Sequence, residues 1–381
     1  MRLSPNSAIR NPQSVIVIDG SYGEGGGQVL RTAMALAAIL QRPLEIHNIR
    51  AGRKKPGLRP QHLIAVKAMT LITAGKVEGA ELGSTRLYFE PRQIVPGSYS
   101  LDVGTAGSTS LVLQTMVPAL LFAKKASRVV ITGGTHVPWS PCFHYLKEVF
   151  VPGLRQMGGA IRVEIERWGW YPKGGGKVIA SVSPVTGLCS IDRTWRGELQ
   201  DTYALSAVSN LPVSIAERQR NQVLKRYRGH GHEVPQIELL EGPSQGTGTV
   251  VFVGARFENG AVGFTSLGKR GKPAEKVADD ACSDFFKFMA SGAAIDDHLA
   301  DQLVLYMALA KGRSSLIAGR ITKHLVTNMW VIEQFLPVKF EVDVEAGRVS
   351  VEGIGFSAGK ENWSGDLVVP AEKGDEASEK N

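Results

Sequence analysis

The sequence predicts an α+β protein built from three repeated units, each with two helices packed on a small β-sheet, together with one inserted α+β domain. Segments with the 3.6-residue period of helices alternate with short apolar runs typical of strands, and the order helix, strand, helix, strand, strand occurs three times. A histidine opens the second helix of each copy, at His62, His144 and His324. The first two lie 82 positions apart and the last two 180, which predicts an insert of about 98 residues before the third copy.

In the first copy, the apolar run 14–19 (SVIVID) reads as a buried strand that leads into a glycine-rich loop, GSYGEGGG. A helix is predicted at 28–40, because these residues are good helix formers with a helical apolar period. The strand PLEIHNI and a basic loop follow. A second helix starts near Gln61, and two short strands, KVEGAEL and TRLYFEP, close the unit.

The second and third copies repeat this order with three recognisable strands in each. The second copy has the loop GTAGSTS, the helix LVLQTMVPALLFA, the strand RVVITGG, a helix from His144 and a hairpin at 160–184. The third has a helix at 296–312, the strand SSLIAG, the helix of His324 and two strands within 338–353. The repeat therefore predicts where each element begins, even where the local signal is short.

The insert is predicted at 188–283, because this stretch has strand and helix signals of its own, including a basic helix, SIAERQRNQVLKRY, and paired strands, TGTVVFVGARF and AVGFTSLG. The repeat-built domain then comprises 14–187 and 284–356. The terminal segments 1–13 and 357–381 are expected to lie outside the fold, the latter as an acidic tail that contains Ser and Lys.

The composition favours an anionic partner such as a nucleotide or nucleic acid, since the net charge is +8 and the isoelectric point is about 9.3. The three cysteines, Cys142, Cys189 and Cys282, are widely spaced and form no metal-ligand pattern such as CxxC. We therefore expect reduced thiols in a cytoplasmic protein. No signal-peptide core is present, and no apolar run approaches the roughly 20 residues of a membrane span, so no membrane partner is expected.

Two loops of the first copy have the composition of phosphate sites. In GEGGGQ, glycines allow backbone N–H groups to approach an anion at a helix start, and Glu24 would repel that anion unless a divalent cation lay between them. A capping role for Glu24 fits equally well. The second loop carries the densest basic run, which is either a solvated face or a clamp on a polyanion. The loop follows a strand and leads to Gln61 and His62, and this position favours the clamp. Its cations are Arg50, Arg53, Lys54, Lys55 and Arg59, and Arg31 on the preceding helix would add a further one.

His324 is the candidate nucleophile. Thr322 can cap a helix whose apolar face is Leu325, Met329, Ile332 and Leu336, which places His324 in the first turn. The helix dipole there opposes a second positive charge and favours a neutral imidazole, while Thr327 and Asn328 lie within reach to orient the ring or a phosphate. On this segment alone, a capping or surface role for the histidine is the preferred interpretation.

Other candidates have two interpretations each. His230 and His232 could bind a metal, although a polar loop is favoured because no third ligand is evident. Trp168, Trp170 and Tyr171 could stack on bases, but aromatic residues on a hairpin more often pack. The glycines at 174–176 are interpreted as the turn of that hairpin.

Five segments together resemble the RNA 3'-terminal phosphate cyclase family over about residues 16 to 353: DGSYGEGGGQVLRTA, IRAGRKKPGLRPQHL, GTAGSTSLVLQT, HLADQLVLYMALA and KHLVTNMWVIEQFLP. The resemblance implies three copies of a unit with two helices and a four-stranded sheet, plus an inserted domain of thioredoxin-like topology. It also implies ATP-dependent conversion of an RNA 3'-phosphate to a 2',3'-cyclic phosphate, through a covalent histidine–AMP intermediate on His324 and an RNA-adenylate. AMP and pyrophosphate would be released.

The same resemblance assigns roles to positions in this sequence. Glu24 matches a metal-binding acid, with Mg²⁺ or Mn²⁺ as the divalent ion, and Asp301 would lie near the phosphates or the metal. Pro141 and His298 would sandwich the adenine. The remaining nucleotide positions are Gln114, Leu299, Ala300 and Gln302, and the triphosphate or RNA terminal phosphate would contact Arg31, Arg50, Arg53, Gln61 and His62.

Two rivals remain on the sequence alone. A non-catalytic cyclase-like protein would act as an RNA-binding factor in ribosome assembly and would lack the nucleophile, whereas His324 and Glu24 are both present here. An enolpyruvate-type transferase would share the scaffold and need no histidine adduct. The preferred partners are therefore ATP and an RNA with a 3'-phosphate end, and whether the chain forms a homodimer is left open.

Overall fold

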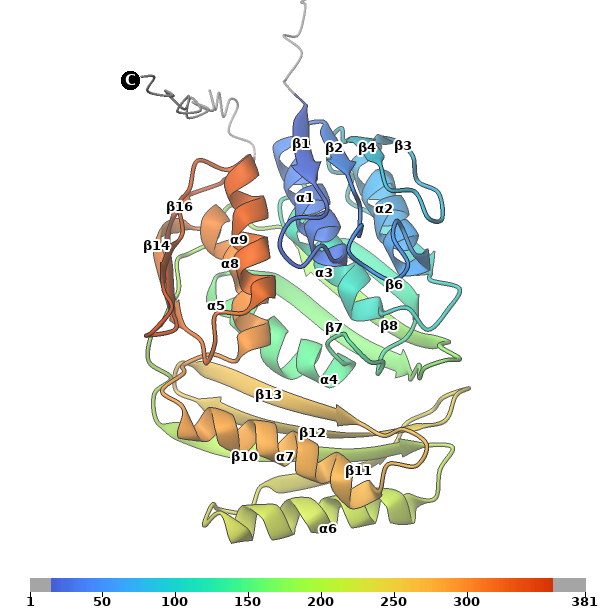
Figure 1. The fold of residues 1–381 in the computed structure, drawn as a ribbon, viewed down its shortest axis with the longest axis vertical. Helices are drawn as coiled ribbons and strands as arrows, with labels where there is room; N and C mark the ends of the chain where they lie inside the picture. Colours follow the sequence, from blue (N-terminus) through green and yellow to red (C-terminus); the bar gives the residue numbers. More distant parts are fainter. Residues whose placement is uncertain (1–14, 359–381) are drawn as a thin grey trace, which may run out of the picture.

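The computed structural model describes residues 15–358, which form four four-stranded sheets and the helices packed on them (Figure 1). This mixed architecture confirms the predicted α+β class. The predicted segment 1–13, residue 14, and the part of 357–381 that begins at residue 359 lie outside the described residues. No helix within residues 15–358 has both the length and the apolar character needed to cross a membrane.

The first sheet has the strand order β1-β2-β4-β3, in which β1 runs parallel to β2 while β4 is antiparallel to both of its neighbours. In β1, buried and exposed residues alternate, so one face of the strand packs on helices and the other does not. The elements of this part of the chain are β1 (Ile16–Asp19), α1 (Gly27–Leu40), β2 (Leu44–His47), α2 (Pro60–Thr73), β3 (Lys76–Glu78) and β4 (Leu87–Glu90).

The second sheet, β5-β6-β8-β7, has the same order and the same strand directions as the first. The sequence did not predict its first strand, because Leu101 is the only buried residue in SYSLD and the segment contains no apolar run. The elements are β5 (Ser98–Asp102), α3 (Thr109–Leu120), β6 (Ser127–Gly133), α4 (Phe143–Tyr145), the π-helical turn η1 (Leu146–Phe150), α5 (Val151–Gln156), β7 (Ala160–Arg167) and β8 (Gly176–Ser183).

The third sheet, β9-β14-β16-β15, again has this order and polarity, but the chain enters it twice. Strand β9 has only two residues and pairs in parallel with β14 before the chain leaves for the insert. So short a strand gives no periodic signal, which is why the sequence did not predict it. The elements are β9 (Asp192–Arg193), α8 (Asp297–Leu309), β14 (Lys311–Ile317), α9 (Lys323–Phe335), β15 (Glu341–Asp343) and β16 (Arg348–Ile354).

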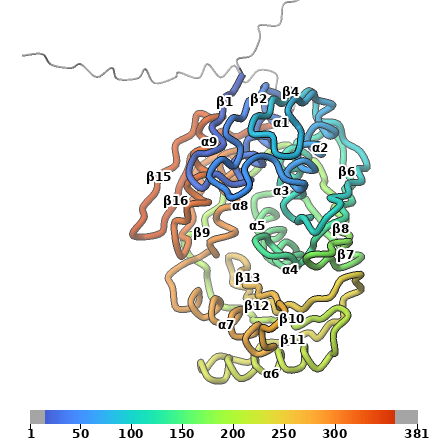
Figure 2. The backbone as a smooth tube through the Cα atoms, turned by 45° about the vertical axis from the view of Figure 1, so that its right-hand side comes forward, coloured from blue at the N-terminus to red at the C-terminus, as the bar shows by residue number. Residues whose placement is uncertain are grey.

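The fourth sheet, β11-β10-β12-β13, lies at the end of the molecule opposite β1 in both views (Figures 1 and 2). Along β12, Val251 and Val253 pack under its helices, whereas Val250 and Phe252 join the main core. Helix α7 extends to Ala290, beyond residue 283, where the sequence placed the end of the insert. The elements are β10 (Leu199–Ser209), α6 (Val213–Gly229), β11 (Gln236–Glu241), β12 (Gly248–Phe257), β13 (Gly260–Leu267) and α7 (Ala274–Ala290).

Helix α1 joins the three upper sheets, because it packs against α9 on one side and against α2 and α3 on others. Nearly all of its residues from Val29 to Ile39 are buried, and four of them are alanines that allow close approach of neighbouring helices. Helix α9 in turn packs on α8 (Figure 1). Segments from the two ends of the described chain are therefore brought side by side.

Candidate active site

His324 lies where the sequence predicted it, in the first turn of α9. The Thr322 hydroxyl accepts a hydrogen bond from the Leu325 N–H at 3.1 Å, which caps the helix. The predicted apolar face is confirmed, since Leu325, Met329, Ile332 and Leu336 are all buried. With that face anchored in the core, the side chain of His324 stays 50% exposed at the helix start.

A relay of side chains from three helices fixes the imidazole. Nδ1 of His324 lies 2.5 Å from Oε1 of Gln28 on α1, and the amide nitrogen of Gln28 donates to the Asp301 carboxylate on α8. Because an amide oxygen only accepts, Nδ1 must carry the proton. In the neutral ring the lone pair is then on Nε2, the nitrogen that points away from the relay.

Glu24 lies beside that nitrogen. Its Oε2 is 2.8 Å from Nε2 of His324, and its Oε1 accepts from Nη2 of Arg53 at 2.7 Å. The Glu24 N–H donates to the Thr327 hydroxyl at 3.2 Å. Helix α1 has no side-chain cap, so Glu24 does not cap it. A single, partly exposed carboxylate suits Mg²⁺ or Mn²⁺, which use one or two carboxylates plus substrate phosphates.

The loop before α1 needs glycine because it runs against α9. Gly23 has a φ of +60°, and a Cβ there would lie 2.2 Å from the Thr327 hydroxyl oxygen. At Gly27 a Cβ would lie 2.4 Å from Nε2 of His62 and 3.1 Å from Nη1 of Arg31. The start of α1 therefore presents unobstructed backbone N–H groups beside a guanidinium and an imidazole, an arrangement suited to an anion.

The protonation of these two neighbours is set by burial. Desolvation, reinforced by Arg31, lowers the pKa of His62 to about 3, so the ring is neutral at pH 7. Its Nδ1 accepts from the Arg59 N–H at 3.1 Å, which leaves the proton on Nε2, facing Gly27. Burial also lowers the pKa of Arg31 to about 10, with Asp301 opposing the shift, so this guanidinium remains a cation.

A cavity next to the relay is lined by Gln28, Arg31, Thr32, Gln114, Asp301 and Gln302. Two buried amide atoms in its wall, Nε2 of Gln114 and Oε1 of Gln302, have no hydrogen-bond partner within residues 15–358. Buried polar atoms are normally paired, so a polar ligand would complete them. Burial raises the pKa of the Asp301 carboxyl, and His324 and Gln28 act against that rise. The polar side of this small cavity offers hydrogen-bond donors and acceptors to a polar ligand, and its other side is apolar, formed by Ala35, Pro118, Phe150 and Leu305.

The other residues that the resemblance assigns to ligand binding differ in their burial and in their hydrogen bonds. Nη1 of Arg50 donates to the carbonyls of Lys55 and Gly57, at 2.7 and 2.9 Å, and so braces its own loop. Gln61 and Pro141 are half-buried, and His298 is exposed at the start of α8. The remaining two, Leu299 and Ala300, have side chains packed in the core, so only their backbone could reach a ligand.

The predicted orienting role of Thr327 and Asn328 takes a different form. Their recorded bonds go to neighbouring helices and the glycine loop rather than to the His324 ring: Asn328 accepts from Thr32 at 2.6 Å and donates to the Asp301 carbonyl at 2.8 Å. Sequence analysis missed Gln28 and Thr32. The signal was present, because Gln28, Arg31 and Thr32 form a polar stripe on a helix that is otherwise alanine-rich and apolar.

The structure favours packing for the two tryptophans but not for Tyr171, which is 66% exposed. Trp168 and Trp170 are 4% and 3% exposed, so neither offers a face to a base. Gly174 and Gly175 have positive φ and turn the hairpin between β7 and β8. The rings of His230 and His232 both stack on Phe286 in the insert.

Comparison with known proteins identifies the family of this chain. A family model described as RNA 3'-terminal phosphate cyclase matches residues 22–342. The RNA 3'-terminal phosphate cyclase of Pyrobaculum aerophilum is 45% identical over 89% of this chain and 99% of its own length. Those of Staphylothermus marinus and Methylococcus capsulatus are each 42% identical, over 90% and 89% of this chain and 99% and 97% of their own. The chain therefore belongs to the RNA 3'-terminal phosphate cyclase family.

Proposed function

We propose that this protein converts an RNA 3'-terminal phosphate to a 2',3'-cyclic phosphate at the expense of ATP, through a histidine–AMP adduct on His324. The relatives' name supports the overall reaction. The observation that carries the adduct is the relay from Asp301 through Gln28 to Nδ1, which leaves Nε2 as the nucleophilic nitrogen. The contact of Nε2 with the Glu24 carboxylate requires a proton between the two groups, so Glu24 must move away and that proton must be lost before the Nε2 lone pair can attack.

In the first step Nε2 attacks the α-phosphorus of ATP, the Pα–O bond to the β-phosphate breaks and pyrophosphate leaves. The phosphorylated ring is cationic, because Nδ1 keeps its proton, and Gln28 Oε1 stabilises that charge by accepting from it. A cationic ring is also a good leaving group in the next step, when it departs as neutral imidazole.

In the second step an oxygen of the RNA 3'-phosphate attacks the adenylate phosphorus, which forms an RNA 3'-pyrophosphate linkage to AMP and frees His324. The ribose 2'-OH then attacks the activated 3'-phosphorus, its proton is lost, and AMP departs as the ring closes. AMP turns a poor leaving group into a good one, which is why ATP is needed.

The residues around the site have distinct roles in this proposal. Glu24 would hold the divalent ion, Mg²⁺ or Mn²⁺, which neutralises phosphate charge when bound. Pro141 and His298 would flank the adenine, and Asp301 would lie near the phosphates. The remaining contacts are assigned to nucleotide (Gln114, Leu299, Ala300, Gln302) and to the triphosphate or the RNA end (Arg31, Arg50, Arg53, Gln61, His62).

The fold that we propose has three copies of one unit, interrupted by an inserted domain of thioredoxin-like topology. Three sheets with the order and polarity of β1-β2-β4-β3 support the repeat. For the insert, the support is a parallel β10–α6–β11 crossover followed by antiparallel β12 and β13. We propose that the insert continues past residue 283 to the end of α7, so that 188–290 interrupts the repeat-built domain.

The test is to incubate the full chain with α-labelled ATP and Mg²⁺ or Mn²⁺ and to follow label on the polypeptide. We expect acid-labile, base-stable label that His324→Ala abolishes and that the exposed-histidine control His230→Ala retains. Cyclisation of a 3'-phosphorylated oligonucleotide should fail in the same variant. An unlabelled wild-type chain that still binds the RNA end would instead identify a binding factor. Cyclisation without any adduct would show that the RNA 3'-phosphate attacks ATP directly, with no histidine intermediate.

A further inference from the structure

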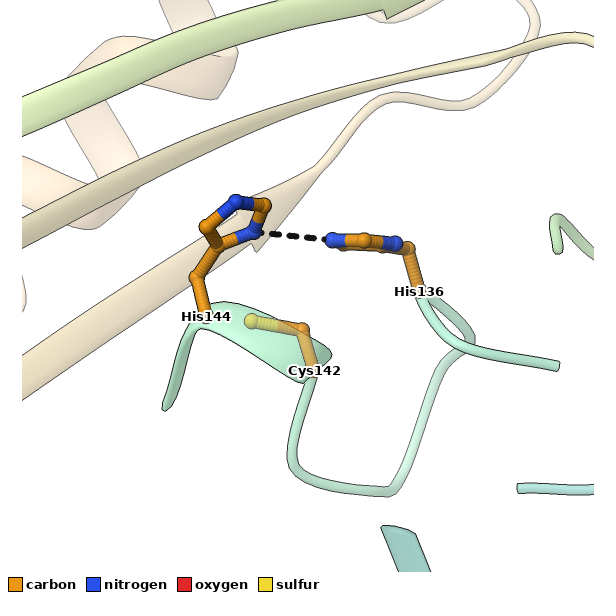
Figure 3. Close-up of side chains that lie close together, drawn as sticks. All are labelled: His136, Cys142 and His144. Carbon is orange, nitrogen blue, oxygen red and sulfur yellow. Dashed lines mark hydrogen bonds between the residues drawn. The ribbon is translucent and has the colours of Figure 1, made fainter. Parts of the chain in front are cut away.

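A second group of ligating side chains lies away from His324, on the loop after β6 and in α4. His136, Cys142 and His144 point toward one another there (Figure 3). Among residues 15–358, this is the only group of three or more His, Cys, Asp or Glu residues close enough to hold a metal ion. We propose that these three residues bind a zinc-class transition-metal ion that fixes this loop.

The distances between the three side chains are near those of a metal site. Nε2 of His136 lies 3.0 Å from Nδ1 of His144, and one ligand atom from each of the three residues lies within 4.8 Å of the others. In a tetrahedral zinc site with bonds of about 2.0 to 2.3 Å, ligand atoms are about 3.3 to 3.8 Å apart. A movement of the Cys142 side chain toward the histidines is therefore sufficient to close the site.

Both imidazoles are held in the neutral form that a metal requires. Burial lowers the pKa of His136 far below its ordinary value, and burial and Lys147 lower the pKa of His144 to about 3. Burial raises the pKa of the Cys142 thiol, so this group is a thiol until a cation is present. Binding would then release one proton from Cys142, and affinity should rise with pH.

The surroundings supply the outer contacts that metal sites use. Nδ1 of His136 is 2.8 Å from the Thr135 hydroxyl, so the nitrogen that would ligate an ion is Nε2, which is hydrogen-bonded to Nδ1 of His144. The His136 ring stacks on Trp168 with centroids 4.3 Å apart, so one side of the site is apolar. Thr265, on β13 of the insert, lies 3.2 Å from the Cys142 sulfur. An ion here would therefore tie the loop to the surface on which the insert packs.

The chemistry of the ligands selects the ion. Two imidazole nitrogens and one thiolate suit Zn²⁺, whereas Glu24 is a hard oxygen ligand suited to Mg²⁺ or Mn²⁺. His144 is less buried than His136 and Cys142, so a fourth ligand would approach the ion from its side. Pro141 immediately precedes the ligand Cys142, so the ion would hold in place the residue that the proposed function sets against the adenine.

The experiment measures metal on the full chain, expressed without a histidine tag and purified without chelator. Wild type should retain about one zinc per chain. After exchange with Co²⁺ it should show a sulfur-to-cobalt charge-transfer band and tetrahedral d–d bands. Cys142→Ser should abolish the charge-transfer band, whereas Cys282→Ser, which removes a buried thiol of the insert, should leave it intact. Excess Mg²⁺ should displace neither metal.

A second variant separates ligation from folding. His144→Gln keeps a polar side chain of similar size, and its zinc affinity should fall at least about tenfold while its circular dichroism matches wild type. The proposal is overturned if wild type takes up neither zinc nor cobalt, or if the charge-transfer band persists in Cys142→Ser. It is also overturned if folded His144→Gln binds zinc as tightly as wild type. None of these readouts depends on the His324 adduct.

Discussion

His324 and His144 occupy corresponding places in the fold but have opposite surroundings. Each lies in the first turn of a helix that follows the second strand of its sheet, β14 before α9 and β6 before α4. The ring nitrogens of His324 face the oxygens of Gln28 and Glu24, and the ring is half exposed. His144 instead meets a second imidazole and a thiol. The backbone position places the imidazole, and neighbours from other elements decide what it can do.

The largest effect that bears on this comparison is expected from Gln28→Ala. Without the amide oxygen nothing holds the proton on Nδ1, so the neutral ring can present the wrong tautomer to ATP. Adduct formation should slow by about 10²-fold in rate constant, with little change in ATP affinity. Single-turnover labelling at several ATP concentrations separates the two quantities.

The matched control is Gln334→Ala, which removes a glutamine of α9 whose amide donates to the Trp330 carbonyl; this variant should label at the wild-type rate. If Gln28→Ala and the control labelled equally fast, the relay would have no part in setting the tautomer, and the contrast with His144 would rest on exposure alone.

A smaller effect is expected from Arg53→Ala, and it should fall on RNA rather than on the adduct. Arg53 is exposed and bonds to Glu24 at 2.7 Å, beside the start of α1. We expect a rise of about tenfold in the KM for a 3'-phosphorylated oligonucleotide at low salt, with adduct formation less affected; the rise should shrink as salt is added, because the variant has one phosphate contact fewer. Steady-state cyclisation over a salt series gives the measurement, with Arg220→Ala on α6 as the control. Full loss of the adduct with intact RNA binding would contradict this assignment.

An effect on stability rather than on activity is expected at His62, which belongs to the His324 region by position but is buried like His136. Its pKa falls from 6.5 in the unfolded chain to about 3 in the fold. Below pH 6.5 the unfolded chain therefore binds a proton that the folded chain does not. Stability should fall with decreasing pH between 6.5 and 3, by up to about 1.4 kcal/mol per pH unit for this group.

His62→Gln removes that proton difference and should flatten the pH dependence of the urea midpoint in this range. The exposed His47, replaced by Gln, is the control. An unchanged slope in His62→Gln would mean that His62 takes up its proton in the folded protein, and that its surroundings resemble those of an exposed ring.

Sequence reasoning reached the elements whose signal is local. The α9 helix, its Thr322 cap and its apolar face follow from spacing and residue type, and the structure confirms them. Strands β5 and β9 were missed because one is largely polar and the other has two residues, and both are defined by the partner strand rather than by their own sequence. Such pairing depends on residues far away in the sequence, so a local pattern does not predict it.

The same limit applies to the sites. Glu24 was singled out because a carboxylate among glycines is unusual, and it does lie against His324. Gln28 was not singled out, because a glutamine at a helix start can have many roles and its partner His324 is 296 positions away. The group of His136, Cys142 and His144 was missed for a different reason. The spacing H-x₅-C-x-H is not a known ligand pattern, and the convergence of the three side chains depends on the turn before α4.

The packing of α1 against α9 has a consequence during protein synthesis. Gln28 leaves the ribosome early, but its partner His324 is translated only after the first two sheets and the whole insert. A prematurely terminated chain that ends before α9 lacks the histidine on which the proposed reaction depends. Under that proposal, such truncated products would form no histidine–AMP adduct.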